Sequence, residues 1–403
     1  MSKLHLSLTL AVILWVSPLR ASEERIDLTL GYYLEDHNRV EVWSPVLNWE
    51  TPLTTTSLIR LQAVYDVVSG ASPTGAPPTK PVREVTKTIT STETYNAVSG
   101  PSGRSRRATR KVTNKETVLE EYGEPILPLQ QFEDARLGVN LEWESRAIDN
   151  WVFTPSAAYS TEQDYESLTG AIKVGREFND KATLLSAALS FTSDSVLVRW
   201  DDEWKDKDTT DGIIGITQVI NPTTLLNASF TAGRSTGYLS DQYKSAMVDG
   251  EVIPEVRPDA RTRWVGMITL NKMFTPVDGS IEASYRYYKD TFGVSANTYA
   301  LTWFQNVGKS WVIAPSFRYY EQSEADFYAP AFEGNPQYFS ADYRLSKLRS
   351  MTCGLKVVWK PSSKVQVSAA YDRYIMEGRD GGRTSADAYP SANIFTVGIK
   401  LWY

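Results

Sequence analysis

The alternation of apolar and polar side chains along short segments constrains this chain most, and residues 392–403 show it clearly. In an extended strand, successive side chains point to opposite faces. One face of this segment is therefore apolar and carries Phe395, Val397, Ile399, Leu401 and the aromatic end Tyr403. A water-soluble sandwich hides such a face in its core, whereas a terminal strand that ends in an aromatic residue is typical of outer-membrane barrels.

The same alternation recurs along the chain and predicts about sixteen strands of about ten residues, the length that a tilted strand needs to cross a bilayer. Mean hydropathy is only −0.32 although 12% of the residues are aromatic, because alternation averages the hydropathy of a barrel wall. We predict an all-β fold for residues 22–403, a transmembrane antiparallel up-and-down barrel with long extracellular loops and short periplasmic turns. A secreted or periplasmic β-sandwich is the competing fold.

The N-terminus has the pattern of a secretory signal peptide. Lys3 supplies a positive charge, residues 4–16 are mostly apolar, and Ala21 ends a plausible cleavage zone. We therefore predict a signal peptide over residues 1–21 and a location in the bacterial outer membrane. A retained anchor helix is the alternative, but the apolar run is shorter than the roughly 20 residues that a spanning helix needs.

Residue usage argues against several classes of function. The net charge of −6 offers no basic surface for nucleic acid. Cys353 is the only cysteine, so an intramolecular disulfide is impossible. The two histidines are His5 in the signal peptide and His37, which gives little support to a Ser-His-Asp triad or a histidine metal site. We expect no catalytic residues, no cofactor and no metal.

Two groups of acidic residues have both a chemical and a structural interpretation. Glu142 and Glu144 share one strand face about 7 Å apart, a separation that suits acid–base hydrolysis, although any amphipathic wall produces such pairs. The acidic run at residues 201–208 offers carboxylate oxygens for calcium, or it is a solvated loop tip. Cys353 is expected to face lipid as an inert side chain.

Residues 70–133 form the longest stretch without clear alternation. The stretch is rich in Gly, Pro, Ser, Thr and charge, and includes a basic run at residues 103–111. A structureless loop of this length is uncommon in a compact domain, so it is either functional or disordered. We expect a solvated extracellular loop, or alternatively a loop that folds into the lumen or binds anionic surface sugar.

Charged side chains on the strands must face the lumen, because a charge facing lipid near the midplane costs roughly 2 to 4 kcal/mol. Parity places both signs inward in similar number, which predicts a weakly selective channel or a lumen partly closed by ion pairs. Arg286 and Arg318 form a basic rung for anions or sugars, or they pair with wall aspartates. The predicted lumen residues are Arg60, Asp66, Arg286, Asp290, Arg318, Tyr320 and Asp372.

Several stretches resemble a family of predicted outer-membrane barrels known as domain of unknown function 3570. They are YDVVSGASPTG at residues 65–75, YRYYKDTFG at 285–293, FRYY at 317–320 with ADFY at 325–328, and SADYRLSKL at 340–348. The resemblance extends over nearly the whole mature chain except the early loop. It implies a location and a fold, and it implies no activity. It also suggests a partner such as an envelope lipoprotein or a periplasmic protein.

The residues and the resemblance together favour a non-enzymatic outer-membrane barrel that works as a porin-like channel or as the barrel of an envelope complex. Two alternatives remain open: a surface adhesin or structural barrel that acts through residues 70–133, and an outer-membrane hydrolase. The expected partners are outer-membrane lipid and the barrel assembly machinery, which would read the terminal strand from Phe395 to Tyr403. No nucleic-acid partner is expected.

Overall fold

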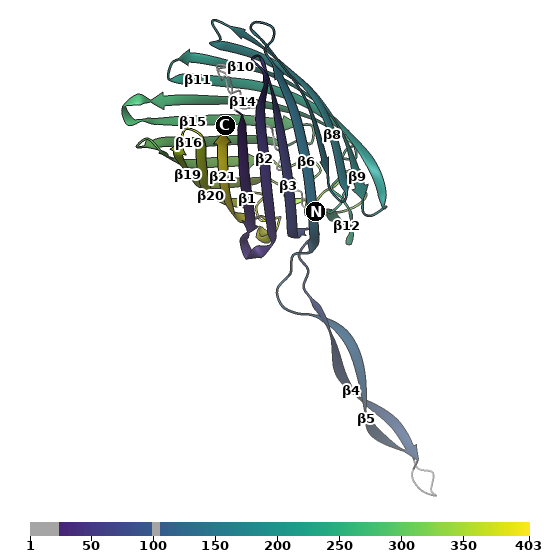
Figure 1. Ribbon diagram of the computed structural model, residues 1–403. Coiled ribbons are helices and arrows are strands. Elements are labelled where there is room, and N and C mark those ends of the chain that lie inside the picture. The colour runs from purple at the N-terminus through teal and green to yellow at the C-terminus, as the bar shows by residue number, and fades with distance from the viewer. Residues whose placement is uncertain (1–23, 99–104) are drawn as a thin grey trace. The chain divides into compact units, whose positions relative to one another are not determined.

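Sixteen antiparallel strands form one closed barrel in the computed structural model, which describes residues 24–98 and 105–403 (Figure 1). The signal-peptide prediction for residues 1–21 lies outside the described residues. Neighbours around the barrel are neighbours in sequence, and β1 closes the sheet by pairing with β21 from Arg25 opposite Trp402 to Glu35 opposite Ala392. The predicted fold class and strand number are confirmed.

The barrel strands are eleven to nineteen residues long, which exceeds the expected ten. They are β1 Arg25–Glu35, β2 Val40–Thr54, β3 Ser57–Pro73, β6 Leu129–Ser145, β7 Trp151–Thr161, β8 Tyr165–Phe178, β9 Thr183–Val198, β10 Glu203–Asn221, β11 Thr224–Gly237, β14 Ala260–Phe274, β15 Gly279–Asp290, β16 Ser295–Val307, β17 Trp311–Gln322, β19 Leu348–Ser362, β20 Val365–Gly378 and β21 Ser391–Trp402.

Alternation separates the two faces of the wall as predicted. On β21, Phe395 and Val397 are 44% and 52% exposed, whereas Gly398 between the apolar positions is buried. On the opposite face, Lys400 forms an ion pair with Asp27 of β1 at 2.9 Å. Large exposed apolar side chains cover the outer face of most barrel strands, and so extensive an apolar surface requires a lipid environment. The exposed Cys353 lies on this face.

The two ends of the barrel differ in their connections. At one end the strands are joined by turns of two to five residues, and the first and last barrel strands begin and finish there. The other end, here called the long-loop end, has the long connectors of residues 74–128, 238–259, 323–347 and 379–390 together with four short turns. No helix among the described residues has the length and hydropathy of a membrane span.

Two segments expected to be irregular are strands. Residues 82–121 form a hairpin of β4 Val82–Val98 and β5 Ser105–Glu121, within a separate compact unit of residues 78–128. Its alternation escapes notice because both faces carry Thr, Lys, Glu and Arg. Most side chains of the basic run at residues 103–111 lie outside the described residues. Most of the acidic run at residues 201–208 is also strand, because β10 begins at Glu203 and leaves only residues 199–202 as a turn after β9.

Three long connectors, here called the mouth loops, cover residues 238–259, 323–347 and 379–390. The first contains β12 Ser245–Val248 and β13 Glu251–Pro254, and the second contributes β18 Ala331–Phe332, which pairs with β12 in a small sheet. Short 3-10 turns η3 Tyr343–Leu345 and η4 Ala386–Ala388 complete them, while η1 Asp36–Asn38 and η2 Thr275–Val277 belong to the short connections.

Candidate functional site

Three of the predicted lumen residues, Arg60, Asp66 and Asp290, form ion pairs. Arg60 lies on the face of β3 opposite the exposed Tyr65. Its guanidinium donates to Glu50 at 2.8 Å and to Glu144 at 3.0 Å, and it also contacts Glu142. These contacts join β2, β3 and β6. Both Glu142 and Glu144 are therefore ion-paired with the guanidinium of Arg60, which supports a structural role for the two acids over a hydrolytic one.

Asp66 is the second wall residue with a basic partner. Its carboxylate accepts a hydrogen bond from Arg136 Nε at 2.8 Å and contacts the hydroxyl of Ser44. The side chain therefore links β3 to β6 on one side and to β2 on the other. An acid held in this way neutralises a neighbouring arginine and adds no net charge to the lumen.

Asp290 and Asp372 also have structural surroundings. The Asp290 carboxylate accepts from Arg261 Nε at 2.8 Å and from the backbone N–H groups of Phe292 and Val294, both at 3.0 Å. It therefore caps the turn between β15 and β16. Asp372 lies beside Gly354 of β19, where a Cβ would collide with its carboxylate.

Arg286 and Arg318 differ from these residues, because within the described part of the chain neither forms an ion pair. Each guanidinium instead lies over a tyrosine two positions along its own strand, Arg286 over Tyr288 at 5.5 Å and Arg318 over Tyr320 at 5.6 Å. Cation–π contact is favourable and leaves the positive charge uncompensated. The buried Nε of Arg286 has no hydrogen-bond partner. These four residues are here called the arginine–tyrosine rung.

The register of the strands places the rung on one patch of the inner wall. Arg286 is opposite Thr298 of β16, and Thr298 is opposite Tyr320 of β17. Arg318 is two residues from Tyr320 on that strand, so the two arginine backbones lie about 12 Å apart. Phe317 and Arg318 are adjacent and both exposed. This pattern is typical of a wall in which the apolar side chain faces lipid and the charged one faces water.

The first mouth loop crosses the long-loop end of the barrel. It leaves β11 and returns at β14, yet Tyr243 packs with Val40 and Phe132 in one cluster, against Tyr33 and Val68 of the inner wall. Around the barrel β11 lies six strands from β3, in the order β3-β6-β7-β8-β9-β10-β11. A loop that connects strands so far apart must span the mouth.

Gly75 shows how closely the loop approaches the end of β3. Its φ of +101° is a conformation that L side chains rarely adopt, and a Cβ there would collide with the carbonyl of Ser245. The N–H of Ser245 donates to the carbonyl of Thr74 at 2.8 Å. The small residues at the end of the stretch at 65–75 therefore allow the loop backbone to pack closely against the end of β3.

A network of six charged side chains holds the first and second mouth loops together. Arg257 contacts Glu255 at 2.7 Å and Asp342 at 2.8 Å. Arg344 contacts the same Asp342 at 2.6 Å and Asp241 at 2.5 Å. The sixth member is Lys244, which is fully buried, donates to Ser72 Oγ at 3.0 Å, and contacts the carbonyl of Pro73. Three cations thus balance three anions in the interior.

The pKa values of this network show burial and charge acting against each other, and burial raises the pKa of Glu255. Burial lowers the pKa of Lys244 to about 8. Burial alone would raise the pKa of Asp342, but Arg344 and Lys244 outweigh it and hold the pKa below its usual range. The pKa of Asp241 is lowered to about 2 in the same way, with Arg344 as the main stabilising charge. These carboxylates remain charged because the cations are in place.

Parity along strands does not reveal this network, since its members lie in loops. A signal was nevertheless present. The stretches that carry the family resemblance at residues 65–75 and 340–348 contain the network contacts Ser72, Pro73, Asp342 and Arg344, and the stretches at 285–293 and 317–320 contain the rung. The stretches that carry the family resemblance therefore contribute residues to the lumen wall and to the mouth of the barrel.

The chain resembles solved outer-membrane proteins at low identity. A bacterial polysaccharide outer membrane secretin is 8% identical, with a TM-score of 0.48 over 95% of this chain and 99% of the other. OccK5 (OpdH) of Pseudomonas aeruginosa is 10% identical, with 0.43 over 96% and 99%. OpdK of Pseudomonas aeruginosa, solved with vanillate, is 8% identical, with 0.41 over 96% and 100%. No curated protein matches the chain.

A family described as "Protein of unknown function (DUF3570)" matches residues 14–398, which is nearly the whole chain. The match includes every stretch from which the resemblance was inferred, and it also extends across the hairpin unit of residues 78–128. The chain therefore belongs to the DUF3570 family.

Proposed function

We propose that the protein is an outer-membrane channel that favours small anions, with an arginine–tyrosine rung on its wall and folded loops across its mouth. The observation that carries this proposal is the uncompensated charge of Arg286 and Arg318. Three acids of the wall are bound to cations: Asp27 to Lys400, Asp211 to Arg263 and Asp66 to Arg136. The two guanidinium groups of the rung therefore carry positive charge that these acids do not compensate.

The rung suits anions for a geometric reason as well. Two guanidinium groups on strands about 12 Å apart at the backbone can approach one small anion between them, and each presents several N–H donors to it. Tyr288 and Tyr320 add flat ring faces, whereas their hydroxyl groups donate to Asp290 and Gln322, both at 2.6 Å. Carboxylates, phosphates and acidic sugars share the chemistry that such a site recognises.

The mouth loops favour a narrow channel rather than a wide, open pore. A barrel of sixteen strands is wide enough for an aqueous lumen, and the loops occupy one end of it with a buried, charge-balanced interior. Solute passage would then depend on the space that these loops leave. The outer-membrane location is part of the proposal, and the apolar outer face, the long loops at one end and the signal-peptide pattern support it.

The test is the ion selectivity of the purified protein in planar bilayers. The wild-type protein should show a reversal potential of anion-selective sign in a salt gradient. Changing Arg286→Gln and Arg318→Gln together removes two positive charges from the lumen, and the reversal potential should move toward cation preference. The matched control is Lys289→Gln, because Lys289 is an exposed residue on the same strand as Arg286 with the opposite parity.

Identical selectivity of the wild type and the double arginine variant would refute the role of the rung. An equal change in the Lys289→Gln control would show that the effect arises from general surface charge. Absence of conductance in every form would count against a channel altogether and in favour of a barrel that serves as a scaffold.

A second candidate is a surface interaction role through the hairpin of β4 and β5. Each of its seventeen-residue strands pairs only with the other, so each leaves one edge unpaired within the described residues. An unpaired edge can accept a strand from another protein. Deleting residues 78–128 should abolish binding to a surface partner and leave conductance unchanged if this role is the main one.

A further inference from the structure

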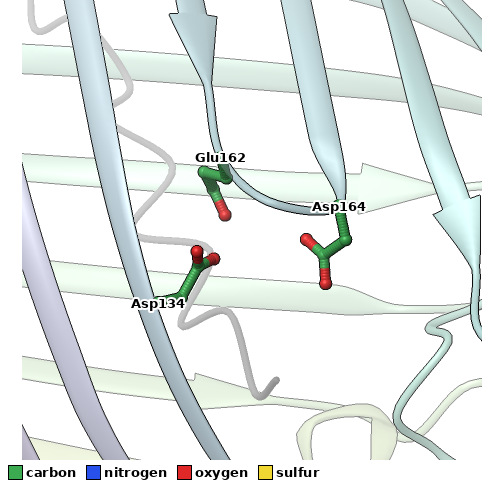
Figure 2. Close-up of side chains that lie close together, drawn as sticks. All are labelled: Asp134, Glu162 and Asp164. Atoms are coloured by element: carbon green, nitrogen blue, oxygen red, sulfur yellow. The ribbon is translucent and has the colours of Figure 1, made fainter.

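Three acidic side chains converge at the long-loop end of the barrel, apart from the rung and from the charged network of the mouth loops. Asp134 lies near the start of β6, and Glu162 and Asp164 lie in the turn between β7 and β8. Figure 2 shows their carboxylates directed toward a common space. One oxygen from each lies within 4.8 Å of the other two.

The convergence of acids is accompanied by a second observation, which is the state of two buried oxygens. Asp134 is 6% exposed and Asp164 is 1% exposed. Asp134 Oδ2 and Asp164 Oδ1 have no hydrogen-bond partner. A buried carboxylate oxygen without a partner costs free energy. A cation bound between the carboxylates would supply the missing partner.

Each of the two buried aspartates uses only its other oxygen in hydrogen bonds. Asp134 Oδ1 accepts from the backbone N–H groups of Ala135 at 2.9 Å and Gln163 at 3.4 Å. Asp164 Oδ2 accepts from the hydroxyl of Tyr243 and lies 3.4 Å from the guanidinium of Arg199. These contacts leave Asp134 Oδ2 and Asp164 Oδ1 as the two buried oxygens that a cation could bind.

We propose that Asp134, Glu162 and Asp164 form a calcium-binding site. Calcium binds oxygen ligands at about 2.3 to 2.6 Å, so oxygens of one site lie at most about 5 Å apart, and the three carboxylates meet this limit. Calcium also accepts irregular coordination by several carboxylates, whereas magnesium demands a near-octahedral shell and retains its waters. Glu162 is only partly buried, which leaves the ion a path from solvent.

The site has a structural consequence, because Tyr243 belongs to the first mouth loop. Its ring packs against the inner wall, its hydroxyl contacts Asp164, and Arg199 lies 4.7 Å from its ring centre. Calcium would fix the orientation of Asp164 and thereby the attachment of the loop to the wall. The inference is independent of anion transport, since it concerns how the mouth is held.

The first test is direct binding to the full-length purified protein in detergent. After removal of divalent ions with a chelator, titration with calcium should give one site per chain with a Kd of about 10⁻⁴ to 10⁻³ M, the range of extracellular calcium modules. Calcium should also raise the thermal unfolding midpoint. Terbium, a luminescent substitute for calcium, should show tyrosine-sensitised emission because the Tyr243 hydroxyl contacts a ligand residue.

The second test uses variants with a matched control. Asp134→Asn with Glu162→Gln removes two ligands and keeps Asp164 with its tyrosine and arginine contacts, and calcium affinity should fall at least about tenfold. The control is Asp201→Asn with Asp202→Asn, which neutralises two exposed acids of the turn between β9 and β10. It should bind calcium like the wild type.

If the double ligand variant does not fold, Tyr243→Phe keeps all three carboxylates, and should retain calcium binding while terbium emission falls. No calcium binding by the wild type up to about 10 mM, ten times the weakest Kd expected, would overturn the proposal. So would equal affinity in the ligand variant, or loss of binding only in the control. A midpoint that responds to pH but not to calcium would show that the acids share a proton, and would also overturn it.

Discussion

The buried network of the mouth loops allows a sharp prediction for Asp342→Asn. Asp342 is 1% exposed and its carboxylate contacts two guanidinium groups, Arg257 at 2.8 Å and Arg344 at 2.6 Å. Asparagine has nearly the same volume, so packing is preserved while the network changes from neutral to a charge of +1. Removing one partner of a buried ion pair typically costs about 3 to 5 kcal/mol.

This cost applies to the equilibrium between closed and open mouth loops, because the sixteen-strand wall does not depend on these contacts. At about 1.4 kcal/mol for each factor of ten, the open population should rise by about a hundred- to a few thousand-fold. Lys244 and Arg344 are trypsin sites, and the closed loops bury Lys244 completely. Cleavage at these sites reports the open population when reclosing is fast.

The assay is the rate of tryptic cleavage after Lys244 and Arg344 in the folded, detergent-solubilised protein. The control variant is Glu251→Gln, which removes the same charge from an exposed position of the first mouth loop, and its rate should match the wild type. Cleavage of Asp342→Asn at the wild-type rate would refute the reasoning, because it would mean that the network does not hold the loops closed. A comparable acceleration in Glu251→Gln would refute it too.

Two further outcomes follow from the same structure. In the closed loop the pKa of Lys244 is about 8, against 10.5 in water, so the closed state binds fewer protons than the open state between these pH values. Loop closure should therefore become more favourable by about 3 kcal/mol as pH rises from about 8 to about 10.5. The rate of tryptic cleavage measured over a pH series should show this dependence, with no contribution from Lys244 below pH 8 and none in the Lys244→Met variant. Val397→Arg places a charge on the lipid face of β21, which costs about 2 to 4 kcal/mol of folding free energy if the position is near the midplane. Thr396→Arg places the same charge on the other face and should be tolerated. Equal folding yields of the two variants in bilayers would contradict the assignment of the faces.

Patterns with a period of two residues predict what depends on the local chain. Phe395 and Val397 show which face of β21 meets lipid, and the same alternation predicts the strand number and the short turns of the barrel. It works because each barrel strand has one apolar face, and a shift of one residue would expose that face to water. The hairpin of β4 and β5 escaped prediction because neither of its faces is apolar.

Contacts between distant strands depend on closure of the barrel. The sequence places Arg60 and Asp66 inward, but their partners Glu50, Glu144 and Arg136 depend on the register of three strands. The choice between a free rung and ion-paired arginines was open for the same reason. Asp290 forms its ion pair with Arg261. Arg286 and Arg318 instead form cation–π contacts with Tyr288 and Tyr320.

The sequence by itself determined the number of barrel strands and the faces of those strands, because these follow from the chemistry of neighbouring residues. Only the tertiary structure decided that the mouth loops cross the lumen, that six buried charges balance there, and that Asp134 meets Glu162 and Asp164. Those groups come from separate strands and loops, so their contacts form only once the barrel has closed and the side chains are buried against one another.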